Sequence, residues 1–180
     1  MNDKEFNAAL DRIRKKDKSA LREIYEEYVG FIYNVCLSVL KNKESAEDIT
    51  SEFFIRLWEK AGQYKPGQAH KGYMATIARN MCIDYIRKYH KEELLDNEDE
   101  DNTNPLEVAD EKTPENEVVE SLSVDQALDR LKPIYRQIVT MKVLGDMTFK
   151  EIAEVLNIPM GTVTWNYQDA IKQLRRFGYE

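Results

Sequence analysis

Apolar side chains recur every three or four residues along most of this 180-residue chain. Ahead of residue 40 the repeat consists of Phe6, Leu10, Ile13, Leu21, Ile24, Tyr28, Phe31, Ile32, Val35 and Val39. This spacing is typical of helices that bury one face, whereas the alternation typical of strands is absent. The pattern therefore predicts an all-α fold.

Local signals for helix starts and ends divide the first half of the chain further. Ser45 and Asp48 form a capping-box pattern at the start of a helix expected to run to Ala61. Glycine and proline residues then interrupt the apolar pattern. A fourth helix is predicted from Tyr73 to Tyr89.

The C-terminal part of the chain has the spacing of a helix-turn-helix. Pro133 suits the first position of a helix, and Gly145 is expected to end that helix. Thr148 and Glu151 form a second capping box, ahead of a short helix in which Ala153 permits close approach of the next one. After the break "NIP", the last helix is expected to bury Val163, Tyr167, Ala170, Ile171 and Leu174.

Residues 91–121 differ in composition from the rest of the chain. Residues 91–120 hold 13 Asp or Glu and two Lys, a net charge of −11 against −7 for the whole chain, which leaves +4 for the remainder. Such a stretch cannot bury enough apolar surface to offset the entropy of ordering. We expect an acidic flexible linker here, between small helical domains at 1–90 and 122–180, the second beginning with a short helix at Ser123.

The sequence disfavours several classes of protein. No run approaches the roughly 18 apolar residues of a membrane span, and the start "MNDKEFNAAL" has no signal-peptide core, which favours a cytoplasmic protein without membrane insertion. Cys36 and Cys82 fall in apolar segments, where reduced, buried thiols are favoured over a disulfide or redox switch. His70 and His90 lack the neighbours of a metal site. No nucleophile–base pair or phosphate loop indicates an enzyme or a cofactor.

Three motifs carry a family resemblance: "AEDITSEFFIRLW" at 46–58, "GYMATIARNMCIDYIRK" at 72–88 and "LDRLKPIYRQIVTMKVLGDMTFKEIAEVLNIPMGTV" at 128–163. In this order they resemble the second and fourth conserved regions of bacterial extracytoplasmic-function sigma factors. The resemblance implies a subunit that binds core RNA polymerase and promoter DNA to direct transcription initiation. Residues 1–90 would dock on polymerase and recognise and melt the minus-10 element, and residues 122–180 would recognise the minus-35 element. An anti-sigma factor is the implied regulatory partner.

The resemblance assigns a polymerase-docking role to the polar face of the helix at 45–61, which in the family grips a coiled coil of the largest polymerase subunit. The residues concerned are Asp48, Glu52, Arg56 and Glu59. A solvated charged face is the alternative interpretation. Ser51 stands where the family usually has Gln, which alters part of the expected contact.

The helix at 73–89 carries polar side chains off its apolar stripe. The candidate minus-10 residues are Lys71, Arg79, Asn80, Arg87 and Lys88. Cationic and amide groups can hold phosphates and read base edges, although a solvated polar face has the same pattern. The preceding loop corresponds to a loop that, in the family, binds a base flipped out of the nontemplate strand. Tyr64 and His70 are the candidate side chains on which such a base would stack.

The last helix is an unusual candidate for the DNA-recognition helix of a helix-turn-helix. Its candidate minus-35 residues are Thr162, Thr164, Trp165, Asn166, Gln168, Lys172, Arg175 and Arg176. Family members commonly have "GTVKSR" and a later Arg where this chain has Thr164, Asn166 and Asp169. The loss of basic residues predicts weaker phosphate binding, with repulsion from Asp169. Trp165 either contacts a thymine methyl or packs between helices, and packing is favoured because exposed Trp is uncommon.

Two alternatives remain at this stage. In the family the connecting segment threads the active cleft and RNA exit path of polymerase, but a solubilising tether fits the same acidic composition. The alternative function is a stand-alone helix-turn-helix regulator, which would carry a dimer interface or an effector domain in place of the docking motif.

Overall fold

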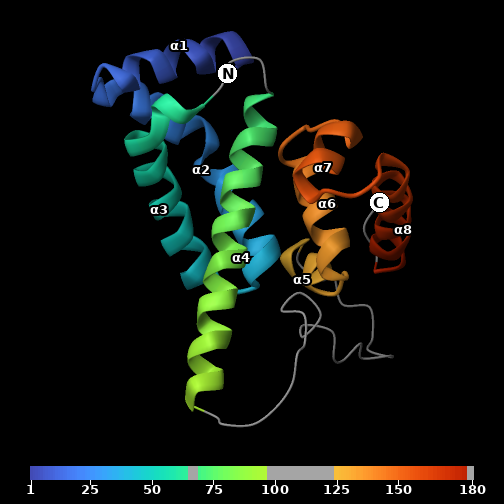
Figure 1. The fold of residues 1–180 in the computed structure, drawn as a ribbon. Helices are drawn as coiled ribbons and strands as arrows, with labels where there is room; N and C mark the ends of the chain where they lie inside the picture. Colours follow the sequence, from blue (N-terminus) through green and yellow to red (C-terminus); the bar gives the residue numbers. More distant parts are fainter. Residues whose placement is uncertain (65–68, 97–123, 178–180) are drawn as a thin grey trace.

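The computed structural model describes residues 1–64, 69–96 and 124–177, and every regular element within them is a helix (Figure 1). The elements are α1 (Asp3–Arg14), α2 (Lys18–Leu40), α3 (Lys43–Lys60), the 3-10 turn η1 (Ala61–Gln63), α4 (His70–Asp96), α5 (Val124–Asp129), α6 (Pro133–Val143), α7 (Phe149–Leu156) and α8 (Met160–Arg176). The expected all-α fold class is confirmed. We call α1–α4 the N-terminal unit and α5–α8 the C-terminal unit.

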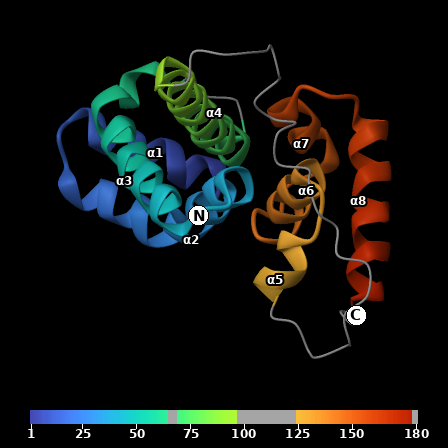
Figure 2. The ribbon, with the colours of Figure 1, turned by 90° about the horizontal axis from the view of Figure 1, so that it is seen from below.

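The N-terminal unit is a bundle in which α2 contacts each of α1, α3 and α4 (Figure 2). The apolar stripe predicted from the sequence forms its core, since Phe6, Leu10, Ile24 and Ile32 are all fully buried. Cys36 of α2 and Cys82 of α4 are free thiols buried in this core. The bundle therefore depends on α2 as its central element.

The start of α3 differs from the sequence interpretation. The N-cap is Asn42, in an extended conformation, and its side chain accepts a hydrogen bond of 2.8 Å from the backbone N–H of Ser45. Asn caps as well as Ser does, so the helix begins at Lys43 and Ser45 lies inside its first turn. Asp48 consequently lies in the helix body and does not complete a capping box.

Helix α4 is longer than the predicted helix at both ends. It begins at His70, ahead of Tyr73, and continues to Asp96, beyond residue 91 where the acidic segment was expected to begin. The rest of that segment up to residue 123, including the expected cap at Ser123, lies outside the described residues.

The C-terminal unit follows the predicted signals closely. Pro133 is the first residue of α6, and the capping box between Thr148 and Glu151 is present at α7. Asn157 ends α7 in the left-handed region at φ 54°, which Asn tolerates better than most residues, and the chain then turns into α8. Helix α8 lies on the outer side of α6 and α7, away from the N-terminal unit (Figure 2).

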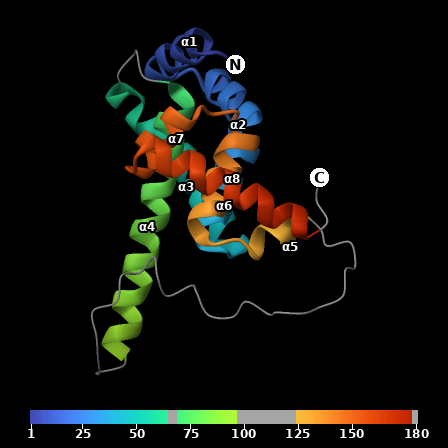
Figure 3. The same cartoon turned by 90° about the vertical axis from the view of Figure 1, so that its right-hand side faces the viewer.

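The two units pack directly on each other. Helix α6 contacts α2, and α7 contacts α4 (Figures 1 and 3). Ile138, Met141 and Met147 are fully buried and belong to the same apolar cluster as the core of the N-terminal unit. We call this contact of α6 and α7 with α2 and α4 the seam; the sequence pattern did not reveal it.

Gly145 makes the seam possible at its closest point. A Cβ atom at this position would lie 2.6 Å from Cε2 of Phe31 on α2 and 2.6 Å from the backbone oxygen of Met141. Both distances are far below van der Waals contact, so no larger residue fits without a shift of α6 relative to α2. Gly145 does end α6 as predicted, and it also allows this close approach.

A hydrogen-bond cluster around the buried ring of His70 joins α1, α2 and the start of α4. The backbone N–H of His70 donates to Oδ1 of Asp3 at 3.0 Å, and the ring Nδ1 of His70 contacts the same oxygen. On the other side of the ring, Nε2 lies 2.6 Å from the hydroxyl of Tyr28, which donates to the backbone oxygen of Met1 at 2.9 Å. The hydrogen bonds from His70 lower the pKa of Asp3.

This cluster overturns the expectation that Tyr64 and His70 are stacking surfaces for a base. Tyr64 is 3% exposed and His70 is 4% exposed, and the ring of Phe6 packs on both of them. Their aromatic faces are therefore occupied by the core of the N-terminal unit. The apolar surroundings favour burial of both rings over exposure in the loop.

We predict that Tyr28→Phe lowers the free energy of unfolding by about 1–3 kcal/mol, because it leaves Nε2 of the buried His70 without its hydroxyl partner. Urea unfolding followed by circular dichroism measures this loss. Tyr25→Phe is the matched control, since Tyr25 lies on the same helix with a side chain that is 46% exposed. Equal losses for the two variants would contradict the role given to the cluster.

Candidate nucleic-acid interface

Six of the eight candidate minus-35 residues lie together on the outer face of α8. They are Thr162, Trp165, Gln168, Lys172, Arg175 and Arg176, all of them exposed. Their spacing of three or four residues, with adjacent residues at the end, keeps them on one side of a helix that turns every 3.6 residues. We call this set the α8 stripe. Its first half is neutral and its second half is cationic.

Thr164 and Asn166 do not belong to the α8 stripe. The hydroxyl of Thr164 donates to the backbone oxygen of Met160 at 3.0 Å. Asn166 is 8% exposed, because it shares the inner face of α8 with Val163 and Ala170. The assignment of Asn166 as a residue that reads bases is therefore corrected: its side chain faces the C-terminal unit.

Trp165 and Asp169 also differ from the sequence interpretation. Trp165 is 61% exposed and does not pack between helices, so its indole is available in the neutral half of the α8 stripe. Asp169 accepts a hydrogen bond of 2.9 Å from Nε2 of Gln173. Burial, and then a hydrogen bond to Asp169, raise the pKa of Tyr135 on α6. The acid thus helps to hold α8 on α6.

The candidate minus-10 residues of α4 divide between two faces. Asn80, Arg87 and Lys88 are exposed, while Lys71 is half-exposed in the first turn. Arg79 instead points towards the C-terminal unit, where its Nε donates to Oε1 of Gln137 at 3.0 Å, and burial lowers its pKa. Arg79 is therefore engaged at the seam.

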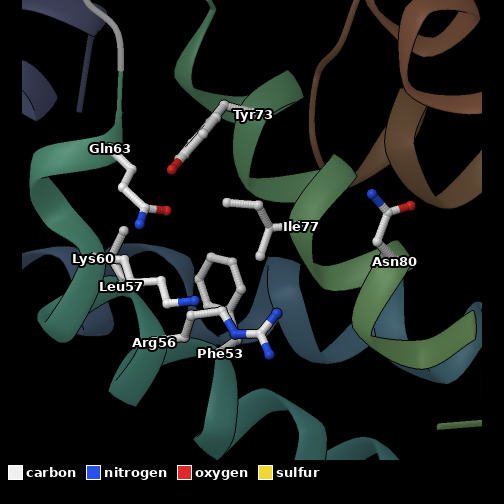
Figure 4. Close-up of a pocket in the computed structure, with 8 residues that line it drawn as sticks. All are labelled: Phe53, Arg56, Leu57, Lys60, Gln63, Tyr73, Ile77 and Asn80. Atoms are coloured by element: carbon white, nitrogen blue, oxygen red, sulfur yellow. The ribbon is translucent and has the colours of Figure 1, made fainter. Parts of the chain in front are cut away.

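A cavity of about 190 Å³ opens between α3 and α4 on the side of Asn80 (Figure 4). Its lining combines apolar side chains, Phe53, Leu57 and Ile77, with polar ones, Arg56, Lys60, Gln63, Tyr73 and Asn80. This volume suits a single ring system better than a drug-sized ligand, and the mixture of an apolar surface with a few polar groups is typical of a binding site.

The sequence interpretation placed a base pocket in the loop before α4 and did not identify this cavity or Tyr73 as one of its lining residues. The signal was present in the spacing, because Tyr73, Ile77 and Asn80 recur at helical intervals on one face of α4. Arg56, expected on the docking face, also lines this cavity. Its Nη2 atom lies 3.8 Å from the carboxylate of Glu52.

The outer face of α3 carries the other candidate docking residues. Asp48, Glu52 and Glu59 are exposed there. Ile55 is exposed as well, at 58%, and it lies between Glu52 and Glu59 on the same face. The sequence interpretation did not include Ile55, because an apolar residue within a helical pattern is expected in the core. The face thus combines acidic side chains with an apolar centre.

Among the residues that the structure describes, no group of three or more His, Cys, Asp or Glu side chains is placed to hold a metal ion. No helix within the same residues is long and apolar enough to cross a membrane.

Comparison with known families places two matches on the chain. Residues 24–92 match the model of Sigma-70 region 2, and residues 121–174 match the model of Sigma-70, region 4. The first match contains α3 and the cavity beside α4, and the second contains nearly all of α8.

Individual relatives extend over most of the chain. The ECF RNA polymerase sigma factor SigW of Bacillus subtilis is 32% identical over 175 residues, which are 93% of each protein. SigM of the same organism is 29% identical over 136 residues, covering 76% of this chain and 81% of SigM. The sigma factor RpoE of Bartonella quintana, solved in complex with the anti-sigma factor NepR, shares the fold with a TM-score of 0.65 at 17% identity, covering 87% of this chain and 94% of that one.

Proposed function

Because the chain belongs to the ECF RNA polymerase sigma factors, we propose that its two units divide the work of promoter recognition between them. The protein is an alternative sigma factor, which binds core RNA polymerase and directs transcription initiation at specific promoters. The observation that carries this function is the 32% identity to SigW over 93% of both chains. A stand-alone regulator would not need the region 2 match at residues 24–92.

The proposed division follows the two family matches. Residues 1–90 dock on polymerase and recognise and melt the minus-10 element, and residues 122–180 recognise the minus-35 element. Residues 91–121 connect them. The protein acts in the cytoplasm, where its polymerase is, and as a polymerase subunit it contributes binding energy and no catalysis of its own.

The α8 stripe supports the minus-35 role. Lys172, Arg175 and Arg176 present cations to phosphates, while Thr162 and Gln168 offer hydrogen bonds to base edges. The exposed Trp165 adds an apolar contact suited to a thymine methyl group. Phosphate binding and base reading are therefore assigned to different halves of the same helix.

The cavity beside Asn80 supports the minus-10 role. An unpaired base that enters it would lie against Phe53 and Ile77 and could bond to the amide of Asn80. Such contacts offset the few kcal/mol that unstacking a base costs. Arg87 lies about two turns further along the same face of α4, where it can hold a phosphate.

The outer face of α3 supports polymerase docking through Asp48, Glu52 and Glu59 around the exposed Ile55. Charged groups around an apolar centre give both orientation and affinity to a protein interface. An anti-sigma factor that covers this face or the α8 stripe would hold the protein inactive. We include such an inhibitor among the proposed partners, with core polymerase and promoter DNA.

For docking, we predict that Glu52→Lys and Ile55→Asp each reduce the affinity for core polymerase by about tenfold or more, because they reverse a charge or place a charge in the apolar centre. Co-purification and titration with core enzyme measure this. Glu47→Lys is the control, since Glu47 is exposed on the same helix about 140° away from Glu52. Unchanged binding for both test variants would exclude this face as the docking surface.

For the cavity, we predict that Asn80→Ala weakens binding of holoenzyme to forked promoter DNA by about 1–3 kcal/mol, and only when one particular nontemplate base is present. An abasic site at that position should remove the difference between variant and wild type. Arg87→Ala should weaken binding whether or not the base is present, because a phosphate contact does not read the base. If Asn80→Ala weakens binding of holoenzyme by the same amount with and without the base, at every nontemplate position tested, base binding in this cavity is refuted.

For the α8 stripe, we predict that Arg175→Ala lowers the slope of log affinity against log salt concentration by about one unit, because one phosphate contact is lost. Trp165→Ala should leave that slope unchanged but reduce discrimination among minus-35 sequences by roughly 1–3 kcal/mol. Titrations of holoenzyme at several salt concentrations measure both effects, with Lys4→Ala on α1 as a control. The stripe would lose its assignment if Arg175→Ala gave the wild-type slope.

A further inference from the structure

Helix α1 lies across the end of the N-terminal unit, where α3 passes into η1 (Figure 1). Its apolar face packs into the core, and its last residue, Arg14, places its guanidinium on the backbone of η1 and of the residue that follows η1. The match to Sigma-70 region 2 begins only at residue 24. The α1 side of this contact therefore lies outside the family match.

The guanidinium of Arg14 holds the backbone on either side of Gln63. Its Nε donates to the backbone oxygen of Ala61 and its Nη2 to that of Tyr64, both at 3.2 Å. Its Nη1 donates to Asp11 at 2.6 Å, which fixes the plane of the group. The last carbonyls of a helix have no partner within the helix, so a cation that donates to them stabilises the helix end. Arg14 is thus a C-terminal cap that another helix supplies.

Gln63 links this cap to the cavity beside Asn80. Its side chain belongs to the cavity lining, which it joins from η1 as Tyr73 joins it from α4 (Figure 4). The ring of Tyr64 also packs edge-to-face on the ring of Tyr73, with the two centroids 4.6 Å apart. The backbone that Arg14 holds therefore carries one residue of the cavity wall and supports another.

We propose that Arg14 is a positioning residue for base binding in this cavity, an inference that rests on the proposed minus-10 role of the cavity. Arg14 does not touch the base. Its bonds to the two carbonyls keep Gln63 ordered in the wall before DNA arrives, so binding does not have to order this side chain. Loss of these bonds weakens binding of the base and leaves contacts with phosphates unchanged. Helix α1 is then part of the unit that recognises the minus-10 element.

Arg12 provides the matched control, because it stabilises the same helix without a bond to the cavity wall. Its side chain is 41% exposed, against 34% for Arg14. Its guanidinium donates to Asp17 at 2.9 Å, to Glu23 at 2.9 Å and to Ser19 at 2.7 Å. These partners lie in α2 and at its N-cap, so Arg12 holds α1 to α2. Replacement of either arginine removes several hydrogen bonds of α1, but only Arg14 bonds to η1 and Tyr64.

Nuclear magnetic resonance of the free ¹⁵N-labelled protein tests the positioning without DNA. We expect Arg14→Ala to lower the heteronuclear Overhauser effect of the side-chain amide of Gln63 and of the backbone amide of Tyr64, which reports motion on the picosecond to nanosecond timescale. Arg12→Ala should leave both signals at their wild-type values. If Gln63 stays as ordered in Arg14→Ala as in the wild type, the positioning role is overturned.

Binding of holoenzyme to forked promoter DNA tests the consequence. The measured quantity is the ratio of two affinities, for DNA that carries the nontemplate base and for the same DNA with an abasic site in its place. Arg14→Ala should lower this ratio by about three- to tenfold, the scale for ordering one long side chain on binding, with the affinity for abasic DNA unchanged. Arg12→Ala should keep the wild-type ratio. An unchanged ratio for Arg14→Ala, or an equal fall for Arg12→Ala, would contradict the proposal.

Two further variants test whether Arg14 acts through Gln63. In a Gln63→Ala background, Arg14→Ala should lower the ratio no further, because the side chain that it positions is gone. A full additional loss would exclude action through Gln63. Arg14→Lys serves if Arg14→Ala does not fold, since it keeps the charge but its single ammonium group cannot bond to both carbonyls as the planar guanidinium does. The same fall in the ratio is expected for Arg14→Lys, and a wild-type ratio would count against the proposal.

The outcomes separate this proposal from the function on which it rests. If the wild type binds intact and abasic DNA equally while Arg14→Ala still mobilises Gln63, base binding in the cavity fails and Arg14 is only a cap of η1. If Asn80→Ala lowers the ratio and Arg14→Ala does not, the proposed function stands and the positioning role alone is refuted.

Discussion

The arrangement of this sigma factor depends on the contact of Gly145 with the ring of Phe31. A Cβ atom at Gly145 would lie 2.6 Å from that ring, so the glycine allows α6 to lie directly on α2. This approach brings Met141 and Met147 into the same apolar cluster as the N-terminal core. The hydrogen bond between Arg79 and Gln137 across the seam follows from it.

If the two units bind the two promoter elements as proposed, the packed arrangement is too small to reach both of them. A compact chain of this length has a radius of gyration of about 16 Å. Two promoter elements roughly 25 base pairs apart are separated by about 85 Å of duplex at 3.4 Å per step. The 27 residues from 97 to 123 can reach about 90–97 Å when fully extended. The proposed division of roles therefore requires the seam to open on the promoter, which would release Arg79 from Gln137. The α8 stripe and the outer face of α3 are already exposed in the packed arrangement.

The sequence predicted the fold well where local rules decide the structure. Thr148 with Glu151, Pro133 and the apolar stripe of α2 behave as their patterns indicated. The prediction was wrong where two nearby residues could both cap the same helix, as when Asn42 caps α3 in place of Ser45. It was also wrong where tertiary packing decides whether a side chain is exposed. Asn166 and Trp165 are adjacent on α8, yet one is buried and the other exposed, because only the orientation of the helix on α6 and α7 distinguishes them. The seam joins residues far apart in sequence, and periodicity carries no information about such contacts.

The position of Trp165 has an optical consequence. The chain holds two tryptophans, and each unit contains one of them. Trp58 is half-buried on α3 with the ammonium group of Lys16 5.3 Å from the centre of its ring, whereas the indole of Trp165 faces water. Indole fluorescence moves to longer wavelength as water reaches the ring, so Trp165 should emit at a longer wavelength than Trp58. The protein therefore carries an intrinsic fluorescent reporter in each unit, without any attached dye.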